Sequence, residues 1–120
     1  MLMITVGKTF TFDSAHFLPG HERCGATHGH TWEVTVEVEG PMDEKGFVLD
    51  FHILNEKMHT ILSMIDHKLI NDLVSPPTCE KISFYLFYRV KNCLRSDHKD
   101  YELKSLKVQE GKGGYAICRG

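Results

Sequence analysis

The sequence predicts an α+β domain in which four strands form a largely antiparallel sheet and two helices cover one face. Three observations lead to this fold class. Segments rich in β-branched and aromatic residues lie near both ends of the chain, two helical periodicities fill its middle, and glycines and prolines separate these segments. The expected order is β-β-α-α-β-β. Residues 1–120 are expected to form a single domain, because this length suits one domain and no repeat or linker interrupts it.

Two strands are expected near the N-terminus. Residues 3–12 are rich in Ile, Val, Thr and Phe, which strands favour. In residues 31–39 the apolar side chains occupy every second position, at Trp32, Val34, Val36 and Val38. This period of two indicates a strand with one face toward the core and the other toward water. Gly40 and Pro41 mark its end.

The middle of the chain predicts two helices. In residues 51–65 apolar side chains recur at steps of three and four, at Leu54, Met58, Ile61, Leu62 and Ile65. Asp50 suits the N-cap of this helix, because its carboxylate can accept from the free amides of the first turn. A second helix is expected after Pro76 and Pro77, with Thr78 as its N-cap. Its apolar stripe is Ile82, Leu86, Val90 and Leu94.

Two more strands are expected near the C-terminus. They span residues 103–109 and 115–118, and Gly111, Gly113 and Gly114 supply the turn between them. The four strands therefore form two pairs, one on each side of the helical segment.

Composition excludes several classes of protein. Fourteen Lys and Arg residues stand against 16 Asp and Glu residues, a formal charge of −2, which argues against broad nucleic-acid binding. No apolar run approaches the roughly 18 residues that a membrane span needs. The four cysteines are scattered without a C-x-x-C pair, so reduced thiols are expected. We expect a cytoplasmic protein with no membrane and no nucleic-acid partner.

Histidines provide the first candidate site. Continuing the alternation of residues 31–39 backward places His28 and His30 on the apolar face, two residues apart. Two buried imidazoles are costly to desolvate unless something uses their lone pairs, and a metal ion would do so. His16 becomes a third ligand if the two N-terminal strands pair. Three histidines with an open fourth position are typical of catalytic zinc, although a lone histidine is more often structural. Four of the other five histidines are expected to be ordinary: His21, His52, His59 and His98.

Other candidate reactive groups are Cys24 and the pair Asp66 and His67. Cys24 lies four residues before His28, in an irregular stretch with Gly25, and a thiol near a metal is partly ionised and reactive. Asp66 and His67 follow the first helix as a candidate acid/base pair. Adjacent residues usually point apart, however, so the alternative for this pair is an ordinary polar surface.

Glu110 is a candidate inward carboxylate. It shares a strand face with Leu106 and Val108, which are expected in the core. A buried carboxylate needs a bidentate donor, and the guanidine-like edge of a cyclic ligand would satisfy it. The alternative is a solvated strand end.

The motifs follow one another in a recognisable order: Phe12-Asp13-Ser14-Ala15-His16, Cys24-Gly25-Ala26-Thr27-His28-Gly29-His30, Asp66-His67, Pro77-Thr78-Cys79-Glu80 and Glu110. This order resembles the 6-pyruvoyl-tetrahydropterin synthase family over residues 10–115. The three residues between Cys24 and His28 are most similar to the bacterial-type branch, the 6-carboxy-tetrahydropterin synthases of queuosine biosynthesis. Animal pyruvoyl synthases have a longer loop here. Family members with glutamate in place of this cysteine cleave the side chain differently, so Cys24 argues against that branch.

The resemblance implies a fold and an assembly. It implies the tunnelling fold (T-fold), in which the four-stranded sheets of three subunits join into a barrel. Two such trimers would stack as a homohexamer, with active sites between subunits. Closure of the barrel would also remove the exposed sheet edges that a small open sheet leaves.

The resemblance also implies a reaction. The substrate would be 7,8-dihydroneopterin triphosphate, and the products 6-carboxy-5,6,7,8-tetrahydropterin, acetaldehyde and triphosphate. Zn²⁺ would polarise the side chain of the substrate, and a thiolate with an acid/base pair would move protons. The implied metal ligands are His16, His28 and His30, the catalytic residues Cys24, Asp66 and His67, and the pterin-binding residues Glu110, Thr78 and Glu80.

Two alternatives remain open at this point. A 6-pyruvoyl-tetrahydropterin synthase would use the same fold and zinc but retain all side-chain carbons. A non-catalytic zinc- or pterin-binding module would need the histidines and Glu110 but neither Cys24 nor the pair Asp66 and His67. The triphosphate requires local positive charge, for which the candidates are Arg23, Lys81 and Lys112.

Overall fold

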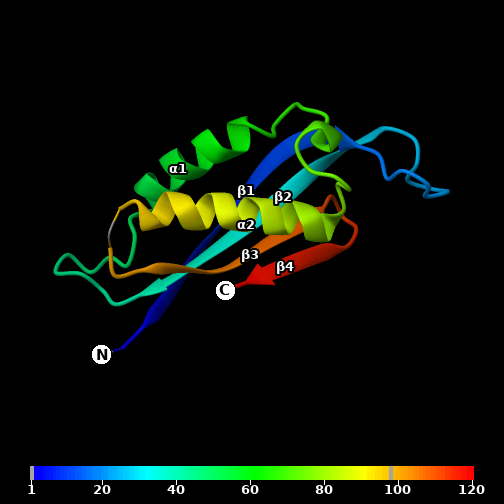
Figure 1. Cartoon of the computed structure of the whole chain (residues 1–120). Coiled ribbons are helices and arrows are strands. Elements are labelled where there is room, and N and C mark those ends of the chain that lie inside the picture. The colour runs from blue at the N-terminus through cyan, green and yellow to red at the C-terminus, as the bar shows by residue number, and fades with distance from the viewer. Residues whose placement is uncertain (1, 98) are drawn as a thin grey trace.

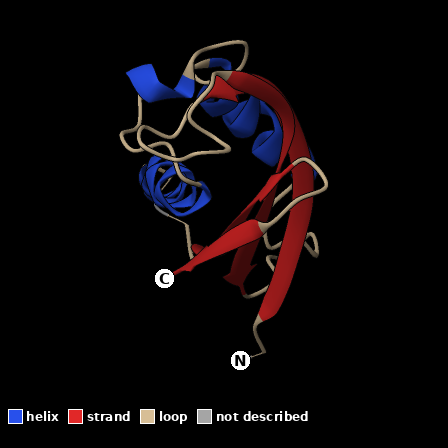
Figure 2. Cartoon of the chain, turned by 90° about the vertical axis from the view of Figure 1, so that its right-hand side faces the viewer, coloured by secondary structure: helices blue, strands red, loops and turns tan. Residues whose placement is uncertain are grey.

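The computed structural model describes residues 2–97 and 99–120. The chain forms strands β1 (Ile4–His16) and β2 (His28–Gly40), helix α1 (Phe51–Ser63), a short 3₁₀ helix η1 (Ile70–Asp72), helix α2 (Cys79–Arg95), and strands β3 (Glu102–Glu110) and β4 (Tyr115–Arg119). All strand pairs are antiparallel, in the order β1-β2-β3-β4. Both helices lie on one face of the curved sheet (Figures 1 and 2). The predicted α+β class, with four antiparallel strands and two helices on one face, is confirmed.

The core lies between the sheet and the helices. The inward stripe of β2, Trp32, Val34, Val36 and Val38, has no exposed surface. The predicted stripes of both helices pack against it as part of one cluster of buried residues. The inward residues of β2 and the apolar stripes of both helices therefore pack in one core layer, as the sequence predicts.

Local capping follows the sequence closely. The Asp50 carboxylate accepts a hydrogen bond from the amide of His52, and the Thr78 hydroxyl accepts one from the amide of Lys81, so both predicted N-caps are confirmed. In the β3–β4 turn, Gly111 has a φ of +55°, a conformation that favours glycine.

The boundaries of several elements differ from those predicted, and strand β2 begins at His28, three residues before its predicted start. Strand β1 continues four residues beyond the predicted end at Phe12, because this stretch pairs with the start of β2. Helix α1 ends at Ser63 and not at Ile65, because the chain turns there to bring the amide of His67 to the carbonyl of Asp13. The sequence did not predict η1, which lies in the connection that follows.

The two outer strands leave sheet edges open. Strands β1 and β4 each pair with one neighbour, and they run antiparallel to each other across the sheet. Near the C-terminal end of β1, the amide of Ala15 bonds to the carbonyl of Lys68, and Ala15 forms a bridge with Leu69. Within the described residues, the rest of the outer edge of β1 has no strand beside it. Open edges of this kind are suited to pairing with another chain.

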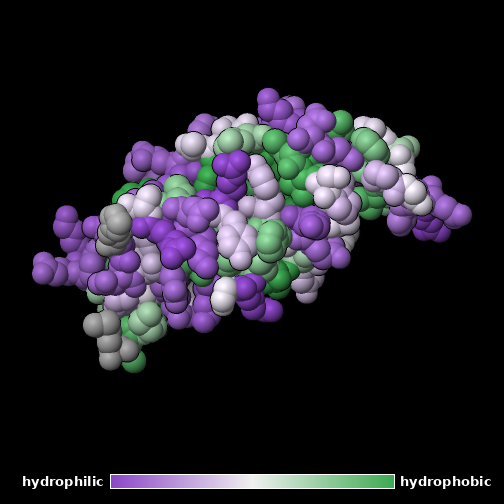
Figure 3. All heavy atoms as spheres, in the orientation of Figure 1, coloured by the Kyte–Doolittle hydropathy of each residue, from purple (hydrophilic) through white to green (hydrophobic). Residues whose placement is uncertain are grey.

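Hydrophilic side chains cover much of the helix-bearing face, with apolar ones between them (Figure 3). Among residues 2–97 and 99–120, no helix is both long and apolar enough to cross a bilayer.

Replacing Trp32 with alanine is expected to destabilise the fold by about 3–5 kcal/mol. Trp32 is fully buried, its ring stacks with Phe12, and its indole N–H donates to the carbonyl of Ser14. The free energy of unfolding can be measured by urea denaturation at a fixed protein concentration. The matched control is Glu33→Ala, an exposed neighbour on the same strand, for which a change within about 0.5 kcal/mol is expected. Equal effects of the two variants would contradict this assignment of Trp32 to the core.

Candidate metal centre and active site

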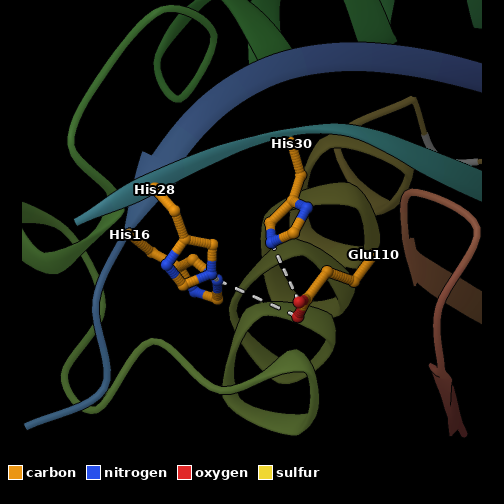
Figure 4. A group of neighbouring side chains, drawn as sticks. All are labelled: His16, His28, His30 and Glu110. Carbon is orange, nitrogen blue, oxygen red and sulfur yellow. Dashed lines mark hydrogen bonds and ion pairs between the residues drawn. The ribbon is translucent and has the colours of Figure 1, made fainter. Parts of the chain in front are cut away.

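The register of the sheet gathers three histidines and one carboxylate. His16 at the end of β1 lies directly opposite His28 at the start of β2, and His30 follows on the same face of β2. Glu110 at the end of β3 lies opposite Trp32, the next inward residue of β2. The four side chains point toward one another (Figure 4), and one potential ligand atom from each lies within 4.8 Å of the other three.

Hydrogen bonds to backbone carbonyls orient two of the imidazoles. The Nδ1 atom of His16 lies 3.0 Å from the carbonyl of Pro77, and Nδ1 of His28 lies 2.8 Å from the carbonyl of Ala26. A carbonyl only accepts, so both Nδ1 atoms donate. In the neutral rings both Nε2 atoms then carry a lone pair, and these atoms lie 3.1 Å apart. Two lone pairs at this distance repel each other unless a cation lies between them. Carbonyl-oriented imidazoles are also typical of metal-binding histidines.

The third imidazole faces the carboxylate. Nε2 of His30 lies 3.0 Å from Oε1 of Glu110, yet within the described residues this buried atom makes no hydrogen bond of good geometry. Burial lowers the pKa of His30, and the nearby Glu110 carboxylate opposes that shift. The ring is therefore held neutral, which is the form that binds metals. A first-row divalent cation such as Zn²⁺ fits this donor set of imidazoles and one carboxylate.

Cys24 lies in the loop between β1 and β2 and is outside the cluster of His16, His28, His30 and Glu110. Its side chain is partly exposed, whereas its backbone is fixed. The amide of Cys24 donates to Nδ1 of His21, 3.0 Å away, and its carbonyl accepts from the amide of Leu18. A Cβ at Gly25 would lie 2.5 Å from the carbonyl oxygen of His21, so the loop requires glycine there. His21, expected to be ordinary, thus shapes the loop that holds Cys24.

Asp66 and His67 form a pair at the outer edge of β1, where they bond to the amide and the carbonyl of Asp13. Nδ1 of His67 lies 2.9 Å from a carboxylate oxygen of Asp66, and the His67 side chain is 77% exposed. The other carboxylate oxygen of Asp66 accepts from the amide of Asp13. This backbone amide holds the pKa of Asp66 below its usual value, and His67 acts in the same direction. The pair forms a separate group with Asp13 and does not join the three histidines within this chain.

The start of α2 connects the two sides of the cluster. Pro77 orients His16 from β1, and the Cys79 thiol donates to the carbonyl of Val108 on β3 at 3.1 Å. Burial raises the pKa of the Cys79 thiol to about 11, so it remains protonated at neutral pH. The Thr78 hydroxyl serves as the helix cap, and Glu80 is exposed in the first turn. Neither side chain belongs to the cluster around His16 within the described residues.

The candidate triphosphate-binding residues and the other described histidines lie at separate places on the molecule. Arg23, Lys81 and Lys112 are exposed. His52 pairs with Glu56 one helical turn away, and His59 lines a cavity of about 400 Å³ between α1 and β1. His98 lies outside the described residues.

Comparison with known proteins places these features in a family. The sequence model of 6-pyruvoyl tetrahydropterin synthase matches residues 5–120. The chain belongs to this family. Among family relatives, a putative 6-carboxy-5,6,7,8-tetrahydropterin synthase of Archaeoglobus fulgidus is 32% identical over 114 residues, covering 95% of this chain and 94% of the relative. A dihydroneopterin monophosphate aldolase of Pyrococcus furiosus is 35% identical over 101 residues, 84% of each chain.

Solved structures agree with the fold of the 6-pyruvoyl tetrahydropterin synthase family. The Caenorhabditis elegans 6-pyruvoyl tetrahydropterin synthase superposes with a TM-score of 0.88 at 22% identity, covering 100% of this chain and 97% of that one. A Plasmodium vivax 6-pyruvoyltetrahydropterin synthase gives a TM-score of 0.76 at 17% identity, covering 100% and 99%. At these identities the superpositions establish the fold alone.

Proposed function

We propose that this protein is a zinc-dependent 6-carboxy-tetrahydropterin synthase. It would convert 7,8-dihydroneopterin triphosphate, with uptake of water, to 6-carboxy-5,6,7,8-tetrahydropterin, acetaldehyde and triphosphate, a step of queuosine biosynthesis. The observation that supports this most directly is the convergence of three oriented imidazoles and the Glu110 carboxylate in one cluster. The relative from Archaeoglobus fulgidus, which matches nearly the whole chain, supports the carboxy branch.

Each residue of the site has a role in this proposal. His16, His28 and His30 hold the zinc ion, which when bound acts as a Lewis acid toward the side-chain oxygens of the substrate. The Glu110 carboxylate accepts hydrogen bonds from the amino group and ring N–H of the pterin. Thr78 and Glu80 lie at the start of α2, close in sequence to Pro77, which orients His16, and would border the same pocket.

Proton transfer is assigned to groups outside the metal cluster. Cys24 as thiolate removes a proton from the substrate side chain. His67 acts as the second acid/base, exchanging a proton with the substrate side chain on the side away from Cys24. Its contact with the Asp66 carboxylate fixes the orientation of the imidazole. The 77% exposure of His67 leaves its outer ring nitrogen accessible to a substrate held by another subunit.

The open edges of the sheet support an assembly in which sites form between subunits. If β4 of one subunit pairs with β1 of the next, the antiparallel order continues and the sheets close into a barrel. In such pairing the C-terminal end of β1, where Asp66 and His67 lie, meets the N-terminal end of the neighbouring β4. That end follows directly on Glu110 and its turn. The proposed homohexamer contains two such trimers.

A second candidate function is side-chain cleavage of a dihydroneopterin phosphate. The specific observation in its favour is the 35% identity to the dihydroneopterin monophosphate aldolase of Pyrococcus furiosus. This activity would split off the side-chain carbons and leave a hydroxymethyl group on the pterin. A pyruvoyl synthase, by contrast, would retain every carbon.

Product identification distinguishes these functions. The zinc-loaded protein is incubated separately with 7,8-dihydroneopterin triphosphate and with the monophosphate, and every product is identified by mass spectrometry. The proposal expects acetaldehyde and the 6-carboxy product from the triphosphate. Formation of a phosphorylated glycolaldehyde and a 6-hydroxymethyl pterin would establish the aldolase. A 6-pyruvoyl product with no aldehyde release would establish the pyruvoyl synthase. Either result would overturn the carboxy assignment.

A further inference from the structure

We propose that Glu110 is the fourth ligand of the metal before substrate binds, and that the arriving pterin draws this carboxylate off the metal. This inference rests on the proposed function for the presence of a metal at the three histidines. It goes beyond that function, which assigns Glu110 to the pterin alone and leaves the fourth metal position open.

The distances within the cluster suit a four-coordinate centre. Metal–ligand bonds of about 2.0–2.1 Å in a tetrahedron place the ligand atoms about 3.3–3.4 Å apart. The Nε2 atoms of His16 and His28 are 3.1 Å apart, and Nε2 of His30 lies 3.0 Å from Oε1 of Glu110. Nε2 of His16 lies 3.9 Å from Oε2 of Glu110. The 3.9 Å contact is to the second carboxylate oxygen, and one ligand atom from each of the four residues lies within 4.8 Å of the others. The four side chains would therefore have to draw together to complete a tetrahedral centre.

The surroundings of Glu110 indicate that its carboxylate needs a cation. The side chain is only 28% exposed, and among the described residues its charged or ionisable contacts are His16 and His30. No Lys or Arg of the described chain pairs with it. A largely buried carboxylate with no Lys or Arg beside it is poorly compensated, whereas a divalent metal bound by the neighbouring imidazoles would neutralise it.

Hydrogen bonds hold the backbone of Glu110 in place, whereas its carboxylate can move by rotation of the side chain. The amide of Glu110 donates to the carbonyl of Gly114, and its carbonyl accepts from the amide of Gly113. The next residue, Gly111, donates to the carbonyl of Thr31 on β2. Only the side-chain torsions of Glu110 must therefore change for the carboxylate to turn from the metal to a ligand, with no movement of the sheet.

This arrangement would couple pterin binding to the release of one coordination position on the metal. A four-ligand zinc site is closed, and a catalytic site needs one exchangeable position. When the amino group and ring N–H of the pterin bind the carboxylate, they compete with the metal for its oxygens. Glu110 would then leave the metal only when the pterin is in place. The coordination position that it vacates would be available to the substrate side chain.

The test uses metal affinity and a spectrum, neither of which requires turnover. In Glu110→Gln the dissociation constant for Zn²⁺, measured by chelator competition, is expected to rise at least about tenfold, because loss of even an outer-shell partner costs 10–100-fold. The matched control is Glu33→Gln on the exposed face of β2, which should bind Zn²⁺ as the unaltered protein does. Circular dichroism checks that both variants are folded.

The Co²⁺-substituted protein reports the movement directly. Addition of 7,8-dihydropterin, which has no side chain to offer the metal, should change the visible Co²⁺ spectrum of the unaltered protein toward that of Glu110→Gln. The same addition should leave the Glu110→Gln spectrum unchanged. Equal Zn²⁺ affinity and identical Co²⁺ spectra in Glu110→Gln and the unaltered protein would overturn the inference. Failure of the unaltered protein to bind metal would instead overturn the zinc assignment in the proposed function, and this inference with it.

Discussion

Replacing Cys24 with alanine should leave the zinc bound and reduce turnover by about 10²–10⁴-fold, the usual contribution of a positioned acid or base. The thiol lies outside the group of His16, His28, His30 and Glu110, so its loss removes no metal ligand. The backbone of the loop is held by contacts of His21 and Leu18 that alanine preserves. Bound zinc is measured by elemental analysis, and turnover by product formation from dihydroneopterin triphosphate.

The companion variant His28→Ala separates the two roles. Its Nε2 faces that of His16, and its loss should reduce both zinc content and turnover to background. Alanine at His52, an exposed histidine paired with Glu56, is the control and should change neither quantity. Full turnover in Cys24→Ala would show that the thiol has no catalytic role. Stoichiometric zinc in His28→Ala would show that this imidazole is not a ligand.

The histidine positions could be predicted because they depend on one local regularity. The alternation at Trp32 and Val34 extends backward to His30 and His28 without a break, so the face of each residue follows from counting. The caps at Asp50 and Thr78 could be predicted for a similar reason, since a cap depends on the few residues that follow it.

The position of Glu110 relative to the histidines could not be predicted in the same way. The alternation of β3 indicates that Glu110 faces inward, but its distance from His30 depends on the register between β2 and β3. That register shifts at Glu37 and Val38, where the pairing is irregular, and a shift by a single residue changes which side chains lie opposite. The sequence therefore predicts three histidines without a fourth partner, whereas the structure places the Glu110 carboxylate beside them.

The contacts of His21 and the location of Asp66 and His67 also could not be predicted. No periodicity marks a loop histidine that accepts from the amide of Cys24. Asp66 and His67 reach the edge of β1 through a turn in which His67 has a φ of +57°, a conformation uncommon for residues other than glycine. Both features depend on how irregular segments pack against β1, which residue type and spacing do not determine.

Mixing two inactive variants should restore activity if the active sites form between subunits. Cys24→Ala and His67→Ala are each expected to be nearly inactive. After joint unfolding and reassembly in equal amounts, about one quarter of the sites should combine an intact Cys24 with an intact His67 from the neighbour. The basis is the exposed position of His67 beside the outer edge of β1, in a group separate from the histidine cluster of its own chain. Turnover per site is measured before and after mixing.

A second mixture distinguishes sites shared between subunits from sites within one subunit. The double variant Cys24→Ala/His67→Ala, reassembled with an equal amount of unaltered protein, should retain about one quarter of full activity if each site draws on two subunits, and about one half if each site lies within one. The two mixtures must agree, because the same subunit statistics govern both. Absence of recovery in the first mixture, with one half retained in the second, would place Cys24 and His67 of the same chain in one site. The open edges of β1 and β4 would then have a role other than the joining of active-site halves.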